Sequence, residues 1–305
     1  MSVDISLIIV NWNTKDLLLH CLSSIQQTIQ GLSYDIWVVD NASSDGSSEA
    51  VRARFPTVHL LENRVNMGFA AANNLALKKM AGRYAVLLNT DTTLTPGAIQ
   101  TLYDFMETHP VAAMACGQLL NPDGSKQNSI ANFPSLASLM CNETLLRILF
   151  PTSFPSKRKE YPSPIEVSSC IGACMMVRKS AMEGVGLLDE RYFFFLEETD
   201  WAYQMKRAGW KIYLVPSAKI FHAQGKSVKN RTDGRILFYR SRYAFFKKWH
   251  PRTYPLICLV VFVRLCINMF LSAIALLSTL GLKKALYHKL ITYCRLFVWH
   301  LKGCP

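Results

Sequence analysis

The sequence predicts an α/β protein with a mostly parallel sheet and helices on both faces, followed by a basic, apolar C-terminal segment. Short runs of Val, Ile and Leu alternate with helical patterns over residues 6–116, which is typical of βαβ units. No repeat period interrupts this alternation. The tail differs in charge, because 15 of the 34 Lys and Arg but only one of the 21 Asp and Glu follow residue 225.

Each expected element follows from local pattern. The first strand is an apolar run after a polar start, and the first helix has apolar residues every three or four positions and ends before Gly31. A polar turn rich in capping residues, 41–48, opens the second helix. We expect strands over 6–10, 35–39, 58–62, 84–88, 111–116, 174–177 and 211–215, and helices over 16–30, 48–54, 68–80, 96–108 and 196–208.

The remaining segments are less regular. Residues 121–167 are rich in Pro, Ser and Asn, which predicts long loops with one helical piece near 136–150. A basic stretch, 226–252, precedes an apolar stretch, 256–282, and a mixed basic and apolar helix over 283–302. We therefore expect one α/β domain over 1–250 and separate basic, apolar helices over 251–305.

Charge and cysteine usage narrow the class of protein. Residues 1–225 hold 19 basic and 20 acidic residues, a net charge of −1, so the body is close to neutral. Residues 226–305 carry a net charge of +14, which accounts for the total of +13. This asymmetry predicts one anionic partner at one end, a membrane face or a nucleic acid. Nine scattered cysteines predict reduced cytoplasmic thiols rather than a zinc ribbon. The first ten residues do not resemble a signal peptide.

Polar side chains follow three of the predicted strands. Trp12 could stack on a flat heterocycle, Asp40 could accept a hydrogen bond from a pyrimidine or a ribose, and Asp91 could hold a divalent cation beside a diphosphate. Each residue alone has an ordinary interpretation, as core residue or turn cap. At successive strand ends they favour a nucleotide-diphosphate site.

A second cluster lies at the start of the predicted helix 196–208. Glu197, Glu198 and Asp200 follow four bulky apolar residues, which suits either a helix N-terminus or a general base with a raised pKa. His222 follows the strand at 211–215. A lone histidine is usually structural, and a metal role for His222 depends on a partner such as Asp91.

Five segments together resemble glycosyltransferase family 2, nucleotide-sugar transferases of GT-A fold, and above all its rhamnosyltransferase-like bacterial members. They are SLIIVNWNT (6–14), VVDNASSDGS (38–47), NMGFAAANN (66–74), LLNTDT (87–92) and the block from GACMMVRKS to FHAQGKS (172–227). The match covers about residues 3–250, and its order and spacing are specific.

The resemblance implies a role for each matched position. The residues expected to contact the nucleotide sugar are Val10, Asn11, Trp12, Asp40, Asn66, Gly68, Asn74, Asn89 and Thr90. Asp91, the last acid of a DxD-like motif that here reads Asn-Thr-Asp, and His222 would bind Mg²⁺ or Mn²⁺. Glu198 would be the base that deprotonates the acceptor, in a position where Asp is more usual, and Glu197 would support it.

The implied activity is inverting sugar transfer from a dTDP- or UDP-sugar, such as a rhamnose donor, to a glycan or polyprenyl-linked acceptor. The expected setting is O-antigen or capsule assembly on the cytoplasmic face of the inner (plasma) membrane. The Gln-x-x-Arg-Trp motif of processive synthases is absent, because Ala208 follows Arg207. A catalytically silent sugar-nucleotide-binding scaffold is the alternative, and a nucleotidyltransferase lacks support because no glycine-rich basic loop lies near the N-terminus.

The tail predicts contact with an anionic membrane surface. Residues 256–282 contain one charge, Arg264, and are long enough to span a bilayer. Nine basic residues precede this stretch within 226–252 and five follow it within 283–302, so a single span would place one basic flank outside. This symmetry favours a re-entrant or interfacial hairpin, with a bend near Ser278, Thr279 and Gly281, although a span stays open. Nucleic acid is not expected, because such binders do not need the apolar stretch.

Overall fold

A computed structural model describes residues 3–151, 153–157, 159–223, 231–280 and 282–303. The strands are β1 (Ile5–Asn11), β2 (Tyr34–Asp40), β3 (His59–Glu62), β4 (Tyr84–Asn89), β5 (Thr92–Leu94), β6 (Ala112–Leu120), β7 (Ile130–Ala131), β8 (Ile165–Glu166), β9 (Ser169–Cys170), β10 (Cys174–Arg178) and β11 (Lys211–His222). The helices are α1 (Lys15–Thr28), α2 (Ser47–Arg54), α3 (Phe69–Leu77), α4 (Ala98–Thr108), α5 (Leu136–Met140), α6 (Glu143–Leu149), α7 (Lys179–Val185), α8 (Glu197–Arg207), α9 (Arg231–Trp249), α10 (Tyr254–Ser278) and α11 (Lys284–Leu301).

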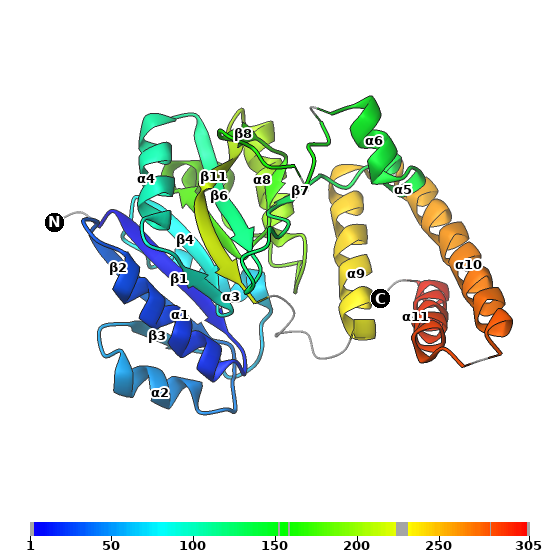
Figure 1. The fold of residues 1–305 in the computed structure, drawn as a ribbon, viewed down its shortest axis with the longest axis horizontal. Helices are drawn as coiled ribbons and strands as arrows, with labels where there is room; N and C mark the ends of the chain where they lie inside the picture. The colour runs from blue at the N-terminus through cyan, green and yellow to red at the C-terminus, as the bar shows by residue number, and fades with distance from the viewer. Residues whose placement is uncertain (1–2, 152, 158, 224–230, 281, 304–305) are drawn as a thin grey trace. The chain divides into compact units, whose positions relative to one another are not determined.

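The main sheet has the order β3-β2-β1-β4-β10-β6-β11-β5, with β8 paired to β11 (Figure 1). The first four strands of this order are parallel, and β11 runs parallel to β6. By contrast, β10 is antiparallel to both of its neighbours. Because β2, β1 and β4 are adjacent and parallel, their carboxyl ends meet at one edge of the sheet, as the sequence predicts.

Helices cover both faces of the sheet. Alternate residues of β1 point to opposite sides, so that Leu7 packs with α1, α2 and α4 while Ile8 packs with α3, α7 and α8. Both faces are dry and apolar, with Leu22 from α1 and Trp201 from α8 completely buried. This two-sided burial explains why the parallel strands read as continuous apolar runs.

Strand β11 is longer than the sequence predicts. Pro216 cannot donate to a strand ladder, so the pattern indicates an end at residue 215. The structure accommodates the proline with a register shift between Val215 and Lys219, after which the strand continues to His222. This continuation places His222 opposite Thr92 of β5, beside Asp91.

Two compact units make up the chain. One comprises Met1–Phe133 and Phe150–Lys229, and the other comprises Pro134–Leu149 and Asn230–Pro305. We call them the catalytic unit and the helical unit. Residues 230–250 and the insertion 134–149 thus group with the C-terminal helices, whereas the sequence suggests a domain boundary at residue 250. For residues 121–167 the sequence suggests loops with a single helical piece. That piece forms two short helices, α5 and α6.

Within the helical unit, α10 and α11 run antiparallel. The ring of Phe262, near the start of α10, lies 5.2 Å from that of His300, near the end of α11. Helix α9 packs on both of them, and Tyr243 of α9 stacks on Trp299 with ring centres 5.9 Å apart. Helix α10 is long and apolar enough to cross a membrane by length and composition alone.

Candidate active site

The ends of β1 and β2 are joined by buried polar side chains. Asn11 lies opposite Asp40 in the ladder, and its Nδ2 donates to Asp40 Oδ1 at 2.9 Å and to Ser43 Oγ at 3.0 Å. The other carboxylate oxygen of Asp40 accepts from the backbone N–H of Ser43 at 2.9 Å. The carboxylate is therefore held in one orientation at the sheet edge, and Trp12 next to it is 44% exposed.

A threonine connects this pair to the end of β4. Thr14 Oγ1 lies 2.8 Å from Asn11 Oδ1 and 2.9 Å from Thr90 Oγ1. Val10 is paired with Asn89 across the ladder. The three polar strand ends predicted from the sequence therefore lie together in the structure.

The loop before α3 is seated against the segment that leads into α8. Asn41 Nδ2 donates to Asn66 Oδ1 at 2.8 Å, and Asn66 Oδ1 also accepts from the N–H of Gly68 at 2.9 Å. The N–H of Phe69 donates to the carbonyl of Phe193 at 2.7 Å. Gly68 has a φ of +83°, and a Cβ there would lie 2.5 Å from that same carbonyl. Asn66 and Gly68 thus shape the contact between the two loops.

Asn74 holds a different turn. Its Nδ2 donates to the carbonyl of Leu188 at 2.8 Å and to Glu190 Oε1 at 2.9 Å, and its Oδ1 accepts from the N–H of Leu188 at 3.1 Å. Both ends of the buried amide are engaged with protein atoms. These contacts give Asn74 a structural role on the approach to α8, and the donor contact implied by the resemblance stays a prediction.

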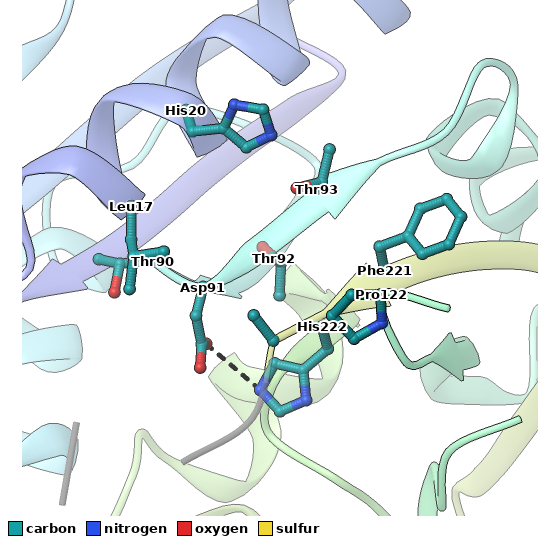
Figure 2. Close-up of a pocket in the computed structure, with 10 residues that line it drawn as sticks. Leu17, His20, Thr90, Asp91, Thr92, Thr93, Pro122, Phe221 and His222 are labelled. Carbon is teal, nitrogen blue, oxygen red and sulfur yellow. Dashed lines mark ion pairs between the residues drawn. The ribbon is translucent and has the colours of Figure 1, made fainter. Parts of the chain in front are cut away.

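Asp91 and His222 face each other at the edge of a pocket. Asp91 Oδ1 lies 3.2 Å from His222 Nε2, and both side chains are buried (Figure 2). The pocket has a volume of about 340 Å³ and is lined by Leu17, His20, Thr90, Asp91, Thr92, Thr93, Pro122, Phe221, His222 and Ala223. A carboxylate and an imidazole therefore border a space that can hold a small polar group.

Gln127 fixes the tautomer of His222. Gln127 Nε2 donates to the Asn121 side chain at 2.8 Å and to the His222 carbonyl at 3.2 Å, so its Oε1 is the acceptor. That oxygen lies 2.6 Å from His222 Nδ1, which must carry a proton to bond with it. In the neutral ring, Nε2 then presents a lone pair to the Asp91 carboxylate, and two acceptors face one another.

This arrangement fits a divalent cation. Two facing acceptors repel unless a proton or a metal ion lies between them. A metal-bound histidine usually donates a hydrogen bond from its other ring nitrogen to a neighbouring acceptor, as His222 does here to Gln127. In the part of the chain that the structure describes, no third His, Cys, Asp or Glu joins the pair. Oxygen atoms of a bound diphosphate would have to complete the coordination, as is usual for Mg²⁺.

The acidic cluster begins α8 in a strained backbone. Phe195 and Leu196 have φ values of 73° and 66°, which are rare for residues with large side chains. Such strain persists only where the surroundings enforce it, and it concentrates at functional sites. The two residues turn the chain so that Glu197 and Glu198 occupy the first turn of α8.

The two glutamates differ in environment. Glu197 is buried, and its Oε2 has no hydrogen-bond partner among the described residues. Burial and then the negative charge of Glu198 raise the pKa of Glu197 well above its ordinary value. Glu198 is half-buried against Gly172, and burial raises the pKa of Glu198 to about 7. The two carboxyl groups are adjacent in the first turn of α8, so the ionisation of each one depends on the charge of the other.

Asp200 has a separate, structural function. Its Oδ1 accepts from Tyr192 Oη at 3.1 Å and its Oδ2 from Gln204 Nε2 at 2.8 Å, in a completely buried position. The sequence predicts separate roles for the acids of this cluster, and these contacts distinguish Asp200 from the glutamates.

Sequence reasoning missed Thr14, Ser43 and Gln127. Thr14 and Ser43 lie inside segments already singled out, and their hydroxyls could have been noticed as partners of Asn11. Gln127 gives no such signal, because it lies in a stretch interpreted as loop and is 95 residues from His222.

The comparisons with known proteins agree with this geometry. The sequence profile named Glycosyl transferase family 2 matches residues 6–186, more than half of the chain. The chain belongs to glycosyltransferase family 2. It is 31% identical over 231 residues to an N-acetylglucosaminyl-diphospho-decaprenol L-rhamnosyltransferase of Mycobacterium tuberculosis, covering 70% of this chain and 75% of that protein. It is 25% identical to the dTDP-rhamnosyl transferase RfbF of Shigella flexneri, covering 75% and 72%.

Two solved structures share the fold. The mannosyltransferase PcManGT from Pyrobaculum calidifontis, in complex with GDP-Man and Mn²⁺, aligns with a TM-score of 0.56 at 17% identity, covering 98% of this chain and 88% of that chain. GalNAc-T7 with UDP, GalNAc and Mn²⁺ aligns with the same TM-score at 14% identity, covering 77% and 47%. The GT-A fold and the rhamnosyltransferase-like membership expected from the sequence are confirmed.

Proposed function

We propose that this glycosyltransferase inverts the anomeric configuration as it moves a sugar, such as rhamnose, from a dTDP- or UDP-sugar to a membrane-proximal glycan or lipid-linked acceptor. The observation that carries the proposal is the glutamate pair in the first turn of α8. Glu197 is buried and its Oε2 has no hydrogen-bond partner among the described residues, while burial raises the pKa of the half-buried Glu198 to about 7. A base whose pKa is near the working pH is best suited to take a proton from a hydroxyl group.

The reaction is a single displacement. Glu198 takes the proton of the acceptor hydroxyl while the acceptor oxygen forms a bond to the anomeric carbon. The bond from that carbon to the diphosphate oxygen breaks, and its electron pair leaves with the nucleoside diphosphate. Attack opposite the leaving group inverts the configuration. Glu197 supports the base from the same turn of α8, and its pKa is raised because it is buried and lies beside Glu198.

The donor lies along the joined strand ends. Asp40, held by Asn11 and Ser43, presents its carboxylate to the edge of the base, which suits the ring N–H of uridine or thymidine. Trp12 is exposed and free to stack on that base. The remaining contacts to the nucleotide sugar are assigned to Val10, Asn66, Gly68, Asn74, Asn89 and Thr90.

Asp91 and His222 are the residues that would hold Mg²⁺ or Mn²⁺. Such a cation would neutralise negative charge that develops on the leaving diphosphate. Gln127 accepts a hydrogen bond from His222 Nδ1, so that in the neutral ring Nε2 carries the lone pair directed at that position. Mn²⁺ is present in both solved relatives described above, which supports a divalent cation without choosing between the two metals.

The acceptor and the location follow from the helical unit and the relatives. The Mycobacterium tuberculosis relative is named for a decaprenol-linked substrate, and a lipid-linked acceptor would be reached from the cytoplasmic face of the plasma membrane. We favour interfacial seating of α10 over a span. Helices α9 and α11 both pack on α10 and both carry several Lys and Arg, which are costly at the centre of a bilayer.

The test is a screen of nucleotide sugars with and without Mn²⁺, read by thermal shift and by release of nucleoside diphosphate. We expect a dTDP- or UDP-sugar to raise the melting temperature only when Mn²⁺ is present, and slow hydrolysis of the same donor without acceptor. Binding without any hydrolysis or transfer would instead identify a silent sugar-nucleotide-binding scaffold. No stabilisation by any donor would contradict the proposed site.

A further inference from the structure

Residues 134–149 interrupt the sequence of the catalytic unit and belong to the helical unit. Several of their apolar side chains are exposed to solvent. Leu145, Ile148 and Leu149 are 47%, 70% and 58% exposed, and their spacing of three and four places them on one face of α6. Met140 at the end of α5 is 67% exposed. Exposed apolar clusters of this kind mark interaction sites. We call these four residues the insertion patch.

The insertion is fixed to the apolar helix α10. Leu139 and Leu146 are buried, and α5 packs on α10 within the helical unit. Arg264 Nη1 donates to the carbonyl of Leu139 at 2.6 Å. Arg264 is the one charge within residues 256–282, so the single cation of the apolar stretch is used to bind the insertion.

Helix α10 has an exposed apolar stripe of its own. Its buried residues Ile257, Val261 and Leu265 lie on one face. The exposed residues recur at helical spacing along the other face and are Leu256, Leu259, Val263, Ile267, Phe270, Leu271, Ile274 and Leu277. The insertion patch is therefore attached to an element that already presents an apolar surface along its whole length.

The charge of the helical unit indicates which kind of partner its exposed apolar surface binds. Residues 134–149 and 230–305, which form this unit, hold 14 Lys and Arg against two acids, so two copies of the unit repel each other and an anionic surface attracts it. A polyanion such as nucleic acid would engage the cations and leave the apolar side chains in water. An anionic bilayer satisfies both, because its headgroups pair with the cations and its acyl chains accept the apolar side chains.

We propose that the insertion patch is a second membrane-contacting element, which enters an anionic bilayer together with the α10 stripe. The chain is thereby held at the lipid surface by two segments far apart in sequence, one of which is continuous with the catalytic unit on both sides. This inference rests on the proposed membrane association of the helical unit.

The test is flotation of the full-length protein with vesicles of phosphatidylglycerol and phosphatidylethanolamine. The variant Leu145→Ser/Ile148→Ser/Leu149→Ser removes three apolar side chains, and we expect its partition into vesicles to fall at least tenfold. The matched triple to Met keeps the surface apolar and is expected to partition within about twofold of the wild type. Val65→Ser/Val111→Ser, two exposed apolar residues of the catalytic unit, is expected to change nothing.

The outcomes separate the two proposals. If the wild-type protein does not float with the vesicles, the membrane association itself fails. If it floats and the Ser triple floats equally well, only the role of the insertion patch fails. Loss of flotation in the Met triple would also contradict the role in lipid contact. So would a Ser triple that changes the oligomeric state in gel filtration without changing flotation. Melting temperature and donor hydrolysis, both expected to be unchanged in the Ser triple, show that it is folded.

Discussion

The catalytic unit and the helical unit differ in how far their apolar side chains are buried. The first encloses its apolar side chains on both faces of a sheet, and buried polar groups such as Asp40 and His222 have partners. The second leaves a stripe of leucines, isoleucines and phenylalanine exposed along α10. The sequence also differs in charge along its length, with a net −1 over residues 1–225 and +14 over residues 226–305. Apolar side chains therefore form a core in one unit, whereas in the other they form the exposed surface for which we propose contact with lipid.

Glu197 departs from this pattern of paired polar groups, as Asp35 Oδ1 and Asn73 Oδ1 of the catalytic unit also do. Its buried Oε2 has no hydrogen-bond partner in the part of the chain described, which an inert core would avoid. Its pKa is raised because it is buried beside Glu198. Glu197 differs from Asp35 and Asn73 because a second carboxylate, that of Glu198, is next to it in the first turn of α8.

The largest expected effect is loss of the base. Glu198→Gln keeps the size of the side chain but cannot take a proton, so we expect turnover to fall by about 10²–10⁴ while donor affinity is kept. Glu183→Gln, at an exposed position of α7, is the matched control and should leave turnover unchanged. Turnover of Glu198→Gln within a factor of ten of the wild type would remove Glu198 from the mechanism.

The pH profile sharpens this test. Because burial raises the pKa of Glu198 to about 7, the side chain gains a proton below that pH and loses its function as a base. Wild-type turnover should then decrease about tenfold per pH unit below 7 and level off above it. The residual activity of Glu198→Gln should lack this dependence.

A smaller effect is expected from the charge of the helical unit. Lys283, Lys284 and Lys289 are exposed at the start of α11, and each lysine near an anionic surface contributes about 1 kcal/mol. Replacing all three by Gln should lower partition into anionic vesicles by about two orders of magnitude at low salt, with hydrolysis of soluble donor unchanged. The same replacements at Lys78, Lys79 and Lys219, exposed on the catalytic unit, should have little effect. Equal losses of vesicle partition in both triple variants would mean that binding depends on the net charge of the protein and not on the position of the lysines.

The smallest effect is expected at Gln127. Gln127→Ala removes the acceptor that keeps the proton on His222 Nδ1, and we expect Mn²⁺ affinity, measured by electron paramagnetic resonance, to fall by about 10- to 100-fold. Gln127→Glu keeps an acceptor there and should bind Mn²⁺ more tightly than Gln127→Ala. Gln26→Ala, exposed on α1, is the control. The ¹⁵N shifts of His222 report the tautomer directly, and an unchanged tautomer in Gln127→Ala would contradict the positioning role.

Much of the site could be predicted because it lies at the ends of regular elements. Val, Ile and Leu runs define β1, β2 and β4, and parallel pairing brings whatever follows them to one edge. Asp40 and Thr90 therefore come together for a reason that is visible in the sequence. The first turn of α8, with its two glutamates, is likewise marked by the change from apolar bulk to acids.

The sequence by itself determined the α/β class, the strand ends that carry polar groups, and the separation of a neutral body from a basic, apolar tail. Only the tertiary structure decided what depends on distant residues. The bulge after Val215 carries β11 past a proline to Asp91, and a loop residue 95 positions away sets the tautomer of His222. The tertiary structure also joins residues 134–149 to α10, through the hydrogen bond from Arg264 to the carbonyl of Leu139. Such contacts depend on side-chain reach and packing between segments, which local periodicity does not encode.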